Sequence, residues 1–233
     1  MNMSDTTDPT SWETNAFEVL STTRAMRRLS PDPVPDELVA RIIDAAIRSP
    51  AGGGVLKVRF VAVTEQATKE AVAAIWSEAF AARRSQHFDR LVDEHVAAGD
   101  EEAATKLRKL ISSSQYLADH IGESPLILFA FGGPDDEASA FPAMWSACLA
   151  ARAFGIGSVF TRILVRDARE QIERLLGADG AEWRLHGVIP MGYPLGRWGV
   201  APRPEATSAC YAERWGEPVA WNSPPERWWS TAT

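Results

Sequence analysis

The sequence has little cysteine and no long hydrophobic run, and both absences narrow the class of protein. Its two cysteines, Cys148 and Cys210, are too few for a disulfide framework. No apolar run approaches the roughly 18 residues that a transmembrane helix needs. The polar residues 1–10 lack the apolar core of a signal peptide. Together these absences predict a cytoplasmic protein with no membrane partner.

Positive charge and metal-binding patterns are scarce as well. There are 24 Lys and Arg against 31 Asp and Glu, a net charge of −7, which argues against a nucleic-acid partner but leaves room for a local basic pocket. No GxGxxG follows a predicted strand, so the dinucleotide fingerprint is missing. The histidines are scattered without metal-ligand spacing, and no metal site is predicted. They are His87, His95, His120 and His186.

The composition, 45% hydrophobic and 24% charged, is that of one globular domain with a large core. We expect a disordered N-terminus at 1–14 and a single domain over 15–233. The charged stretch at about 82–117 predicts a helical insertion with exposed helices, and 203–233 predicts a C-terminal arm. Cys148 lies in the apolar run 143–151, where a buried thiol is expected.

Hydrophobic periodicity predicts an α+β chain with about four strands. A helix should begin near Ala16, and Asp36 should cap the next one. Further helices are expected at 67–82, 141–154 and 168–176. The predicted strands are 58–64, 125–131, 158–165 and 183–191.

The segment Thr23-Arg-Ala-Met-Arg-Arg28 is the first candidate site. The guanidiniums of Arg24, Arg27 and Arg28 repel one another unless an anion lies near, and their planar fork suits phosphate. If the segment opens a helix, free N–H groups and the helix dipole would add to the site. The alternative is a solvated basic turn.

Three further motifs are each ordinary when taken alone. The loop Ser49-Pro-Ala-Gly-Gly-Gly54 allows close backbone approach to a flat ligand, or is simply flexible. The segment Gly155–Thr161 leads from a helix into a strand. The irregular segment Gly192–Pro204 carries Arg197 and Arg203, which could equally form surface salt bridges. The order and spacing of the four motifs carry more information than any one of them.

That order resembles the nitroreductase family. The opening is similar to the family's in TTRAMRRLSPDPVPDELVARIIDAAIRSPAGGG, and AFPAMWSACLAARAFGIGSVFT is similar to its long central helix and glycine exit. MGYPLGRWGVAPRPEATSACYAERWGEP is similar to its Gly-Tyr-Pro segment, late arginine and C-terminal arm. The resemblance runs from about Phe17 to Pro218.

The resemblance implies an α+β fold with a mixed central sheet flanked by helices, built as an intertwined homodimer with FMN at the interface. NADH or NADPH would reduce the flavin, which then reduces a small-molecule acceptor by a ping-pong route. The chemistry belongs to the cofactor, so no catalytic side chain is expected. We expect the tryptophan-rich tail to wrap around the partner subunit, or else the last ten residues to be disordered.

Cofactor contacts are carried over residue by residue. The phosphate would be bound by Arg24 with Arg27 or Arg28, and by Arg203 as a second clamp. The backbone of Ala25 and Met26 would lie beside the ribityl chain. The isoalloxazine ring would meet the loop of Pro50, Ala51, Gly52 and Gly54 at its edge and the backbone of Phe160 and Thr161 near N5.

The sequence departs from the family pattern in the first motif and at the ring end of this site. Ala25 stands where serine is common, and Gly54 and Leu56 stand where the family usually has asparagine and glutamine. Each lost amide contact would cost about 1 kcal/mol. The four ordered motifs and the resemblance nevertheless imply an oxidoreductase acting on a nitroaromatic, quinone or other unsaturated acceptor. Two alternatives are a flavin-storing or flavin-sequestering protein without turnover, and an enzyme for a specialised dehydrogenation.

Overall fold

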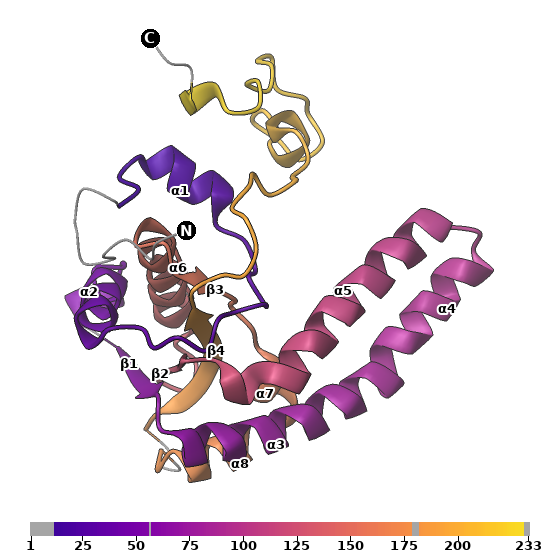
Figure 1. Cartoon of the computed structure of the whole chain (residues 1–233). Helices are drawn as coiled ribbons and strands as arrows, with labels where there is room; N and C mark the ends of the chain where they lie inside the picture. The colour runs from indigo at the N-terminus through magenta and orange to yellow at the C-terminus, as the bar shows by residue number, and fades with distance from the viewer. Residues whose placement is uncertain (1–11, 56, 179–181, 231–233) are drawn as a thin grey trace.

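The computed structural model describes residues 12–55, 57–178 and 182–230. Its centre is a sheet with helices on both faces (Figure 1). The strand order is β1-β2-β4-β3, and each neighbouring pair is antiparallel. The strands are β1 (Val58–Val63), β2 (Leu126–Gly132), β3 (Gly157–Ser158) and β4 (Arg184–Gly192).

The antiparallel pairing corrects the expectation of a mixed sheet. Among the described residues, the parallel element is an isolated bridge between Ala25 and Ser158. The strand expected at 158–165 is also wrong beyond Ser158. After one bridge between Thr161 and Val188 the chain turns into the helix α7 (Ile163–Asp167). A helical turn places Leu164 and Val165 together in the core, which overrides their β propensity.

Strand β2 lies at the centre and is buried on both faces, which explains its continuous apolar sequence. Side chains alternate along a strand. Leu126, Leu128 and Ala130 pack toward α2 (Asp36–Ala46) and α6 (Glu137–Ala153). Ile127, Phe129 and Phe131 pack on the opposite side.

The α2 and α6 side holds a compact helix pair, with α1 (Ala16–Thr22) against α6. Asn15 caps α1 by accepting the N–H groups of Phe17 and Glu18. Asp36, expected as a cap, is the first residue of α2 and follows the N-cap position Pro35. Cys148 is buried on α6, as predicted.

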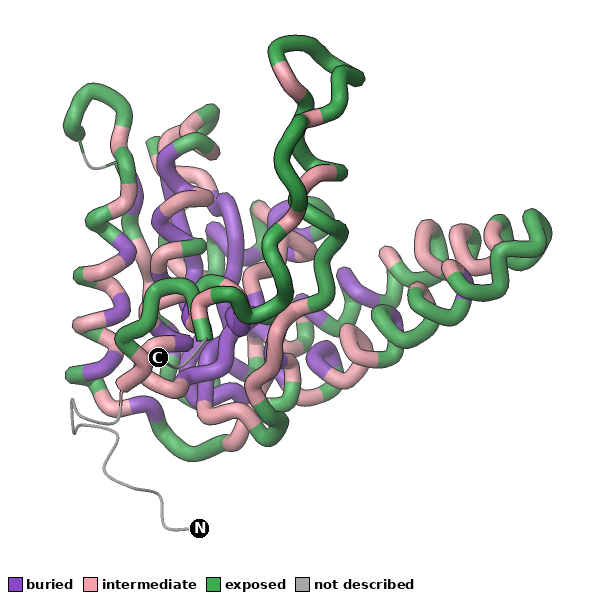
Figure 2. The backbone as a smooth tube through the Cα atoms, turned by 90° about the horizontal axis from the view of Figure 1, so that it is seen from above, coloured by how far each residue is buried: buried purple, intermediate pink, exposed green. Residues whose placement is uncertain are grey.

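The other side of the sheet carries α3 (Gln66–Arg83), α7 and α8 (Arg169–Leu175), with the C-terminal part of α5 (Glu101–His120). A π-helical turn, Arg84–Phe88, joins α3 to α4 (Asp89–Ala97). The antiparallel pair α4–α5 extends beyond the sheet and is largely exposed, as expected from its charge (Figures 1 and 2). Short 3₁₀ turns lie at Gly52–Gly54, Ile121–Glu123, Ala206–Ala209 and Trp228–Ser230.

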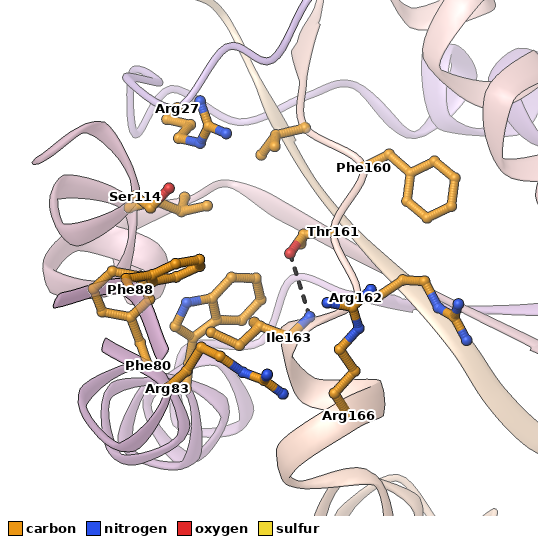
Figure 3. Close-up of a pocket in the computed structure, with 13 residues that line it drawn as sticks. Arg27, Phe80, Arg83, Phe88, Ser114, Phe160, Thr161, Arg162, Ile163 and Arg166 are labelled. Carbon is orange, nitrogen blue, oxygen red and sulfur yellow. Dashed lines mark hydrogen bonds between the residues drawn. The ribbon is translucent and has the colours of Figure 1, made fainter. Parts of the chain in front are cut away.

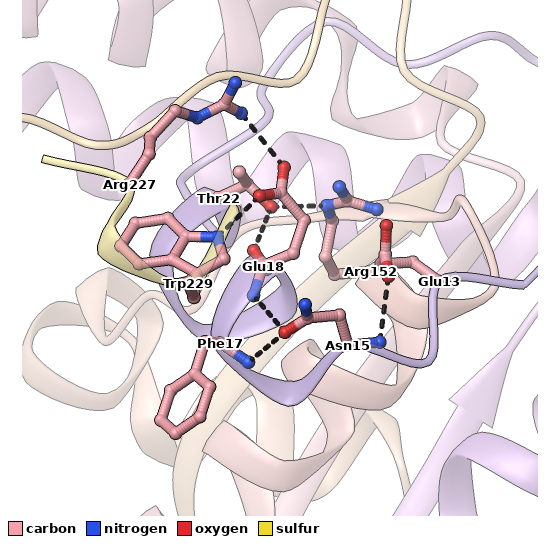
Figure 4. Close-up of polar contacts among 8 residues, drawn as sticks. All are labelled: Glu13, Asn15, Phe17, Glu18, Thr22, Arg152, Arg227 and Trp229. Carbon is pink, nitrogen blue, oxygen red and sulfur yellow. Dashed lines mark hydrogen bonds and ion pairs between the residues drawn. The ribbon is translucent and has the colours of Figure 1, made fainter. Parts of the chain in front are cut away.

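The C-terminal arm leaves the sheet and returns to α1 at its end (Figure 1). Glu18 accepts hydrogen bonds from the Trp229 indole at 2.8 Å and from Arg227 at 3.1 Å (Figure 4). Phe17 and Trp228 pack with ring centroids 4.6 Å apart. The described part of the last ten residues is thus attached to the chain's own α1. At the N-terminus the description begins at Trp12, whose ring packs on Phe154, and the earlier residues of the expected disordered segment lie outside it.

Candidate functional site

The arginine segment, residues 23–30, is an extended stretch held between two of the other motifs. The Met26 N–H donates to the Ser158 carbonyl at 2.9 Å. On the other side, the Leu195 N–H donates to the Arg28 carbonyl at 3.0 Å. Backbone hydrogen bonds therefore join three of the four motifs that the sequence singled out.

A glycine makes this junction possible. A Cβ added to Gly157 would lie 3.0 Å from the Met26 Cβ. It would also lie 3.1 Å from side-chain atoms of Leu29 and Pro194. Those three residues belong to the arginine segment and to the Gly-Tyr-Pro motif, so the absence of a side chain at Gly157 lets the motifs meet.

The extended backbone sends the three guanidiniums in different directions. Arg27 points into a pocket, whereas Arg28 lies over the Tyr116 ring with its Cζ 4.1 Å from the centroid. Arg24 is exposed. The segment does not open a helix, so the expected contribution of helix N–H groups is absent.

The pocket beside Arg27, called the central pocket, has a volume of about 430 Å³ (Figure 3). It lies between α3 and α5 on one side and the 159–163 segment with α7 on the other. It is lined by Arg27, Trp76, Phe80, Arg83, Phe88, Ser114, Leu117, Val159, Phe160, Thr161, Arg162, Ile163 and Arg166.

Aromatic walls and guanidiniums dominate this pocket. Arg83 forms a two-point ion pair with Asp167 at 2.6 and 3.0 Å, which raises the pKa of the guanidinium. Arg162 pairs with Glu137 at 2.6 Å. Within the described ranges of the chain, Arg27 and Arg166 have no carboxylate partner. The central pocket therefore carries surplus positive charge.

Two donors in the pocket lack a good partner inside the described chain. Arg27 is half-buried and donates to the Ser113 hydroxyl at 3.4 Å, which is long for a hydrogen bond. Burial lowers the pKa of Arg27, yet a guanidinium stays charged at neutral pH. The Arg162 Nε is buried with no hydrogen-bond partner among the described residues. The weakly bonded guanidinium of Arg27 fits an anionic or carbonyl-bearing ligand, whereas the Arg162 Nε is closed to solvent.

Phe160 and Thr161 line the central pocket, but the Thr161 backbone is already occupied. Its N–H donates to the Val188 carbonyl and its carbonyl accepts from the Val188 N–H, both at 3.0 Å. The Thr161 hydroxyl faces the Ile163 N–H at 3.5 Å (Figure 3). In this chain a ligand beside Thr161 would therefore meet side chains rather than a free Thr161 amide.

The glycine loop lies apart from the central pocket. Pro50, Ala51, Gly52 and Gly54 follow α2, and none of them lines it. Gly54 is exposed with a positive φ of 69°. Leu56, the other departure from the family pattern, lies outside the described residues.

Arg203 also lies elsewhere in the single chain. It is exposed, and its guanidinium donates to the Pro202 carbonyl at 2.9 Å. It lines a cleft between α1 and the arm, together with Thr23 and Trp229. Arg27 and Arg203 therefore line different cavities of the single chain and are not placed to bind one phosphate together.

Sequence reasoning missed several residues of the central pocket. Trp76, Phe80 and Arg83 are spaced by four and three residues, which places them on one face of α3. That spacing is visible in the sequence, but it does not reveal that this face meets the arginine segment. Arg162 lies in the strand expected at 158–165 and Arg166 directly after it, and neither was singled out.

The chain belongs to the nitroreductase family, whose model matches residues 20–193. The protein is therefore an NAD(P)H-dependent flavin oxidoreductase of the nitroreductase family. A search of curated proteins found no match. Within the described parts of the chain, no helix is long and apolar enough to cross a membrane, and no group of three His, Cys, Asp or Glu side chains is placed for a metal ion.

Solved structures share the fold at low sequence identity. An oxidised iodotyrosine deiodinase bound to FMN and 3-iodo-L-tyrosine is 19% identical, with a TM-score of 0.63, covering 82% of this chain and 96% of that one. A Bacteroides fragilis nitroreductase with bound FMN is 18% identical, with a TM-score of 0.62 and coverage of 86% and 100%. The Vibrio harveyi NADPH:FMN oxidoreductase complexed with NAD+ is 16% identical, with a TM-score of 0.63 and coverage of 88% and 79%.

Proposed function

We propose that this protein binds FMN and passes hydride from NADH or NADPH to a nitroaromatic, quinone or other unsaturated acceptor by a ping-pong route. The observation that carries the proposal is the central pocket, where aromatic walls surround guanidiniums with surplus charge. Three of the four family-like motifs meet beside it. The FMN-bound relatives named above support the choice of flavin.

The residues present fit the cofactor. The pocket volume of about 430 Å³ lies in the range of small-molecule sites, about 300–1,000 Å³. Trp76, Phe80 and Phe88 offer flat apolar surface for a ring system. The free hydrogen-bonding capacity of Arg27 suits a phosphate or a ring carbonyl.

Each part of the pocket has a separate task in this proposal. Arg27 supplies a fixed positive charge, and the Met26 backbone, bonded to Ser158, sets its position. The aromatic side chains exclude water, which strengthens the electrostatic interactions inside the pocket. Bound FMN would supply the hydride chemistry itself, so no protein acid or base is assigned.

A homodimer is part of the proposal. The loop at 50–54 is exposed in the single chain and lies outside the central pocket, as a loop that serves the partner's flavin would. Large apolar side chains are also left exposed, among them Phe17, Leu20 and Trp145, while Trp215 is 91% exposed. Surfaces of this kind favour burial against a second subunit.

The test is a flavin titration followed by turnover. We expect the purified protein to bind FMN in a saturable way and to oxidise NADPH or NADH in the presence of a quinone or nitroaromatic. Tight FMN binding with no nicotinamide oxidation across many acceptors would contradict the enzyme proposal and support a flavin-storing protein. Failure to bind FMN would overturn both.

A further inference from the structure

A second group of cations lies on the outer side of α5, next to the central pocket. Its members, called the basic rim, surround a surface hollow of about 370 Å³. The hollow is lined by Arg28, Thr105, Arg108, Lys109, Ser112 and Ser113. Three positive groups and three hydroxyl groups therefore share one hollow, and no carboxylate lines it.

The charges of the basic rim are only weakly neutralised. Arg108 lies 3.6 Å from Glu101, and both side chains are at least half exposed. A surface ion pair of this kind contributes little, so a phosphate dianion can displace it. Within the described residues, Lys109 and Arg28 have no carboxylate partner. In a protein of net charge −7, such a cluster is a local exception.

Arg28 is held in place rather than left mobile. Its guanidinium lies over the Tyr116 ring, and that ring stacks on His120 with centroids 4.1 Å apart. Stacking fixes the direction of the guanidinium and lowers the entropy lost when it binds an anion. The hydroxyls of Thr105, Ser112 and Ser113 add donors at the same hollow.

The basic rim is continuous with the central pocket. Ser113 lines the rim and also accepts the hydrogen bond of Arg27, which lines the pocket. The neighbouring Ser114 lines the pocket itself. The flavin proposed for the pocket and a phosphate bound at the rim would therefore be neighbours along this edge of α5.

We propose that the basic rim binds the 2′-phosphate of NADPH, so that the protein uses NADPH in preference to NADH. This inference rests on the proposed function, since it names the reductant that feeds the flavin. The 2′-phosphate is a monoester dianion that NADH lacks, and it matches the clustered cations and hydroxyls of the rim. The sequence alone gives no fingerprint for this choice.

The experiment separates the rim from the flavin. Calorimetry measures binding of adenosine 2′,5′-bisphosphate, 5′-AMP and inorganic phosphate to the FMN-loaded protein and to the double variant Arg108→Gln/Lys109→Gln. We expect the bisphosphate to bind at least about tenfold more tightly than 5′-AMP or phosphate, which corresponds to about 1.4 kcal/mol of binding free energy. The double variant should lose that difference while keeping its FMN content.

The control is the double variant Arg90→Gln/Lys106→Gln. It removes two positive charges from the same α4–α5 pair, at residues that do not line the rim. In steady-state kinetics the rim variant should raise the KM for NADPH about tenfold and leave the KM for NADH nearly unchanged. Equal binding of bisphosphate and AMP, unchanged NADPH kinetics, or an equal loss in the control would overturn the inference. If the protein takes up no FMN, the proposed function is refuted. Bisphosphate binding to the flavin-free protein then still tests whether the rim binds a 2′-phosphate.

Discussion

Arg27 connects the backbone junction to the central pocket. Removing its side chain in Arg27→Ala should take away the half-buried charge that lacks a carboxylate partner among the described residues. A hydrogen bond to a charged group contributes about 1.5–3 kcal/mol. We therefore expect FMN affinity to fall by roughly 10- to 100-fold, measured by fluorescence titration.

Arg48→Ala is the matched control, because Arg48 forms an exposed pair with Asp44 on α2, away from the pocket. It should leave FMN affinity unchanged. Equal affinities for Arg27→Ala and the parent protein would show that the central pocket is not where the flavin binds.

The two cysteines should differ sharply in reactivity. Burial raises the pKa of the Cys148 thiol to about 11, whereas Cys210 is exposed. At pH 8 only about one Cys148 in a thousand would be the reactive thiolate, and the fraction rises only as the pH approaches 11. A thiol reagent should label one group per native chain and two in denaturant. Rapid native labelling of both would contradict the burial of α6.

At this scale the sequence located the arginine segment but not the direction of its side chains. Arg24 was expected to bind the phosphate with either Arg27 or Arg28, and the extended backbone separates Arg27 from Arg28 across α5. The direction of these side chains depends on the hydrogen bond between Met26 and Ser158, residues 132 positions apart. No local pattern encodes such a contact.

Gly157 is the residue through which separate elements come together. In Gly157→Ala the new Cβ would lie 3.0–3.1 Å from side-chain atoms of Met26, Leu29 and Pro194, which is closer than ordinary van der Waals contact. Overpacking of this kind costs about 1–3 kcal/mol. We expect a lower thermal midpoint, with a shift of roughly 2–4 °C per kcal/mol, and weaker FMN binding.

Gly196→Ala provides the comparison for this element, since its added Cβ would meet no atom within 4 Å beyond its neighbours in the chain. It should leave both stability and FMN binding unchanged. If Gly157→Ala behaved in the same way, the junction of the three motifs would not be as tight as described.

The arm and α1 form a second contact between distant elements. Glu18→Ala removes the acceptor of both Trp229 and Arg227, which should release the end of the arm (Figure 4). We expect faster limited proteolysis within residues 203–230, as followed by mass spectrometry. Glu70→Ala on α3 is the control, since within the described parts of the chain the Glu70 carboxylate accepts one hydrogen bond, from Gln66 at the surface. Unchanged cleavage in Glu18→Ala would mean that the contact does not hold the arm.

Elements decided by local composition were predictable, and those decided by long-range packing were not. The β2 run and the α4–α5 pair follow directly from hydrophobicity and charge. The segment Ile163–Asp167 could not be predicted in this way. Its apolar sequence favours a strand, but it forms a helix whose side chains pack in the core around Trp76. The sheet was expected to be mixed because the prediction came from resemblance, whereas its named strands pair antiparallel.

Across the whole molecule, the net charge hides two local positive clusters. The chain is acidic overall, yet four arginines line the central pocket and two arginines and a lysine line the basic rim of α5. Local positive potential in an acidic protein attracts small anions without general binding to nucleic acid. The single chain also leaves the 50–54 loop and Arg203 away from the pocket, so we expect a second copy of the chain to complete the flavin site.

The most direct test of FMN binding at the central pocket is the flavin retained by the whole protein. Purified protein and its Arg27→Ala variant are incubated with excess FMN, desalted, and measured by visible absorbance for flavin bound per chain. We predict close to one flavin per chain for the parent protein and a clear loss for the variant. A parent protein that leaves the column without flavin, or a variant that retains as much as the parent, would contradict the proposal.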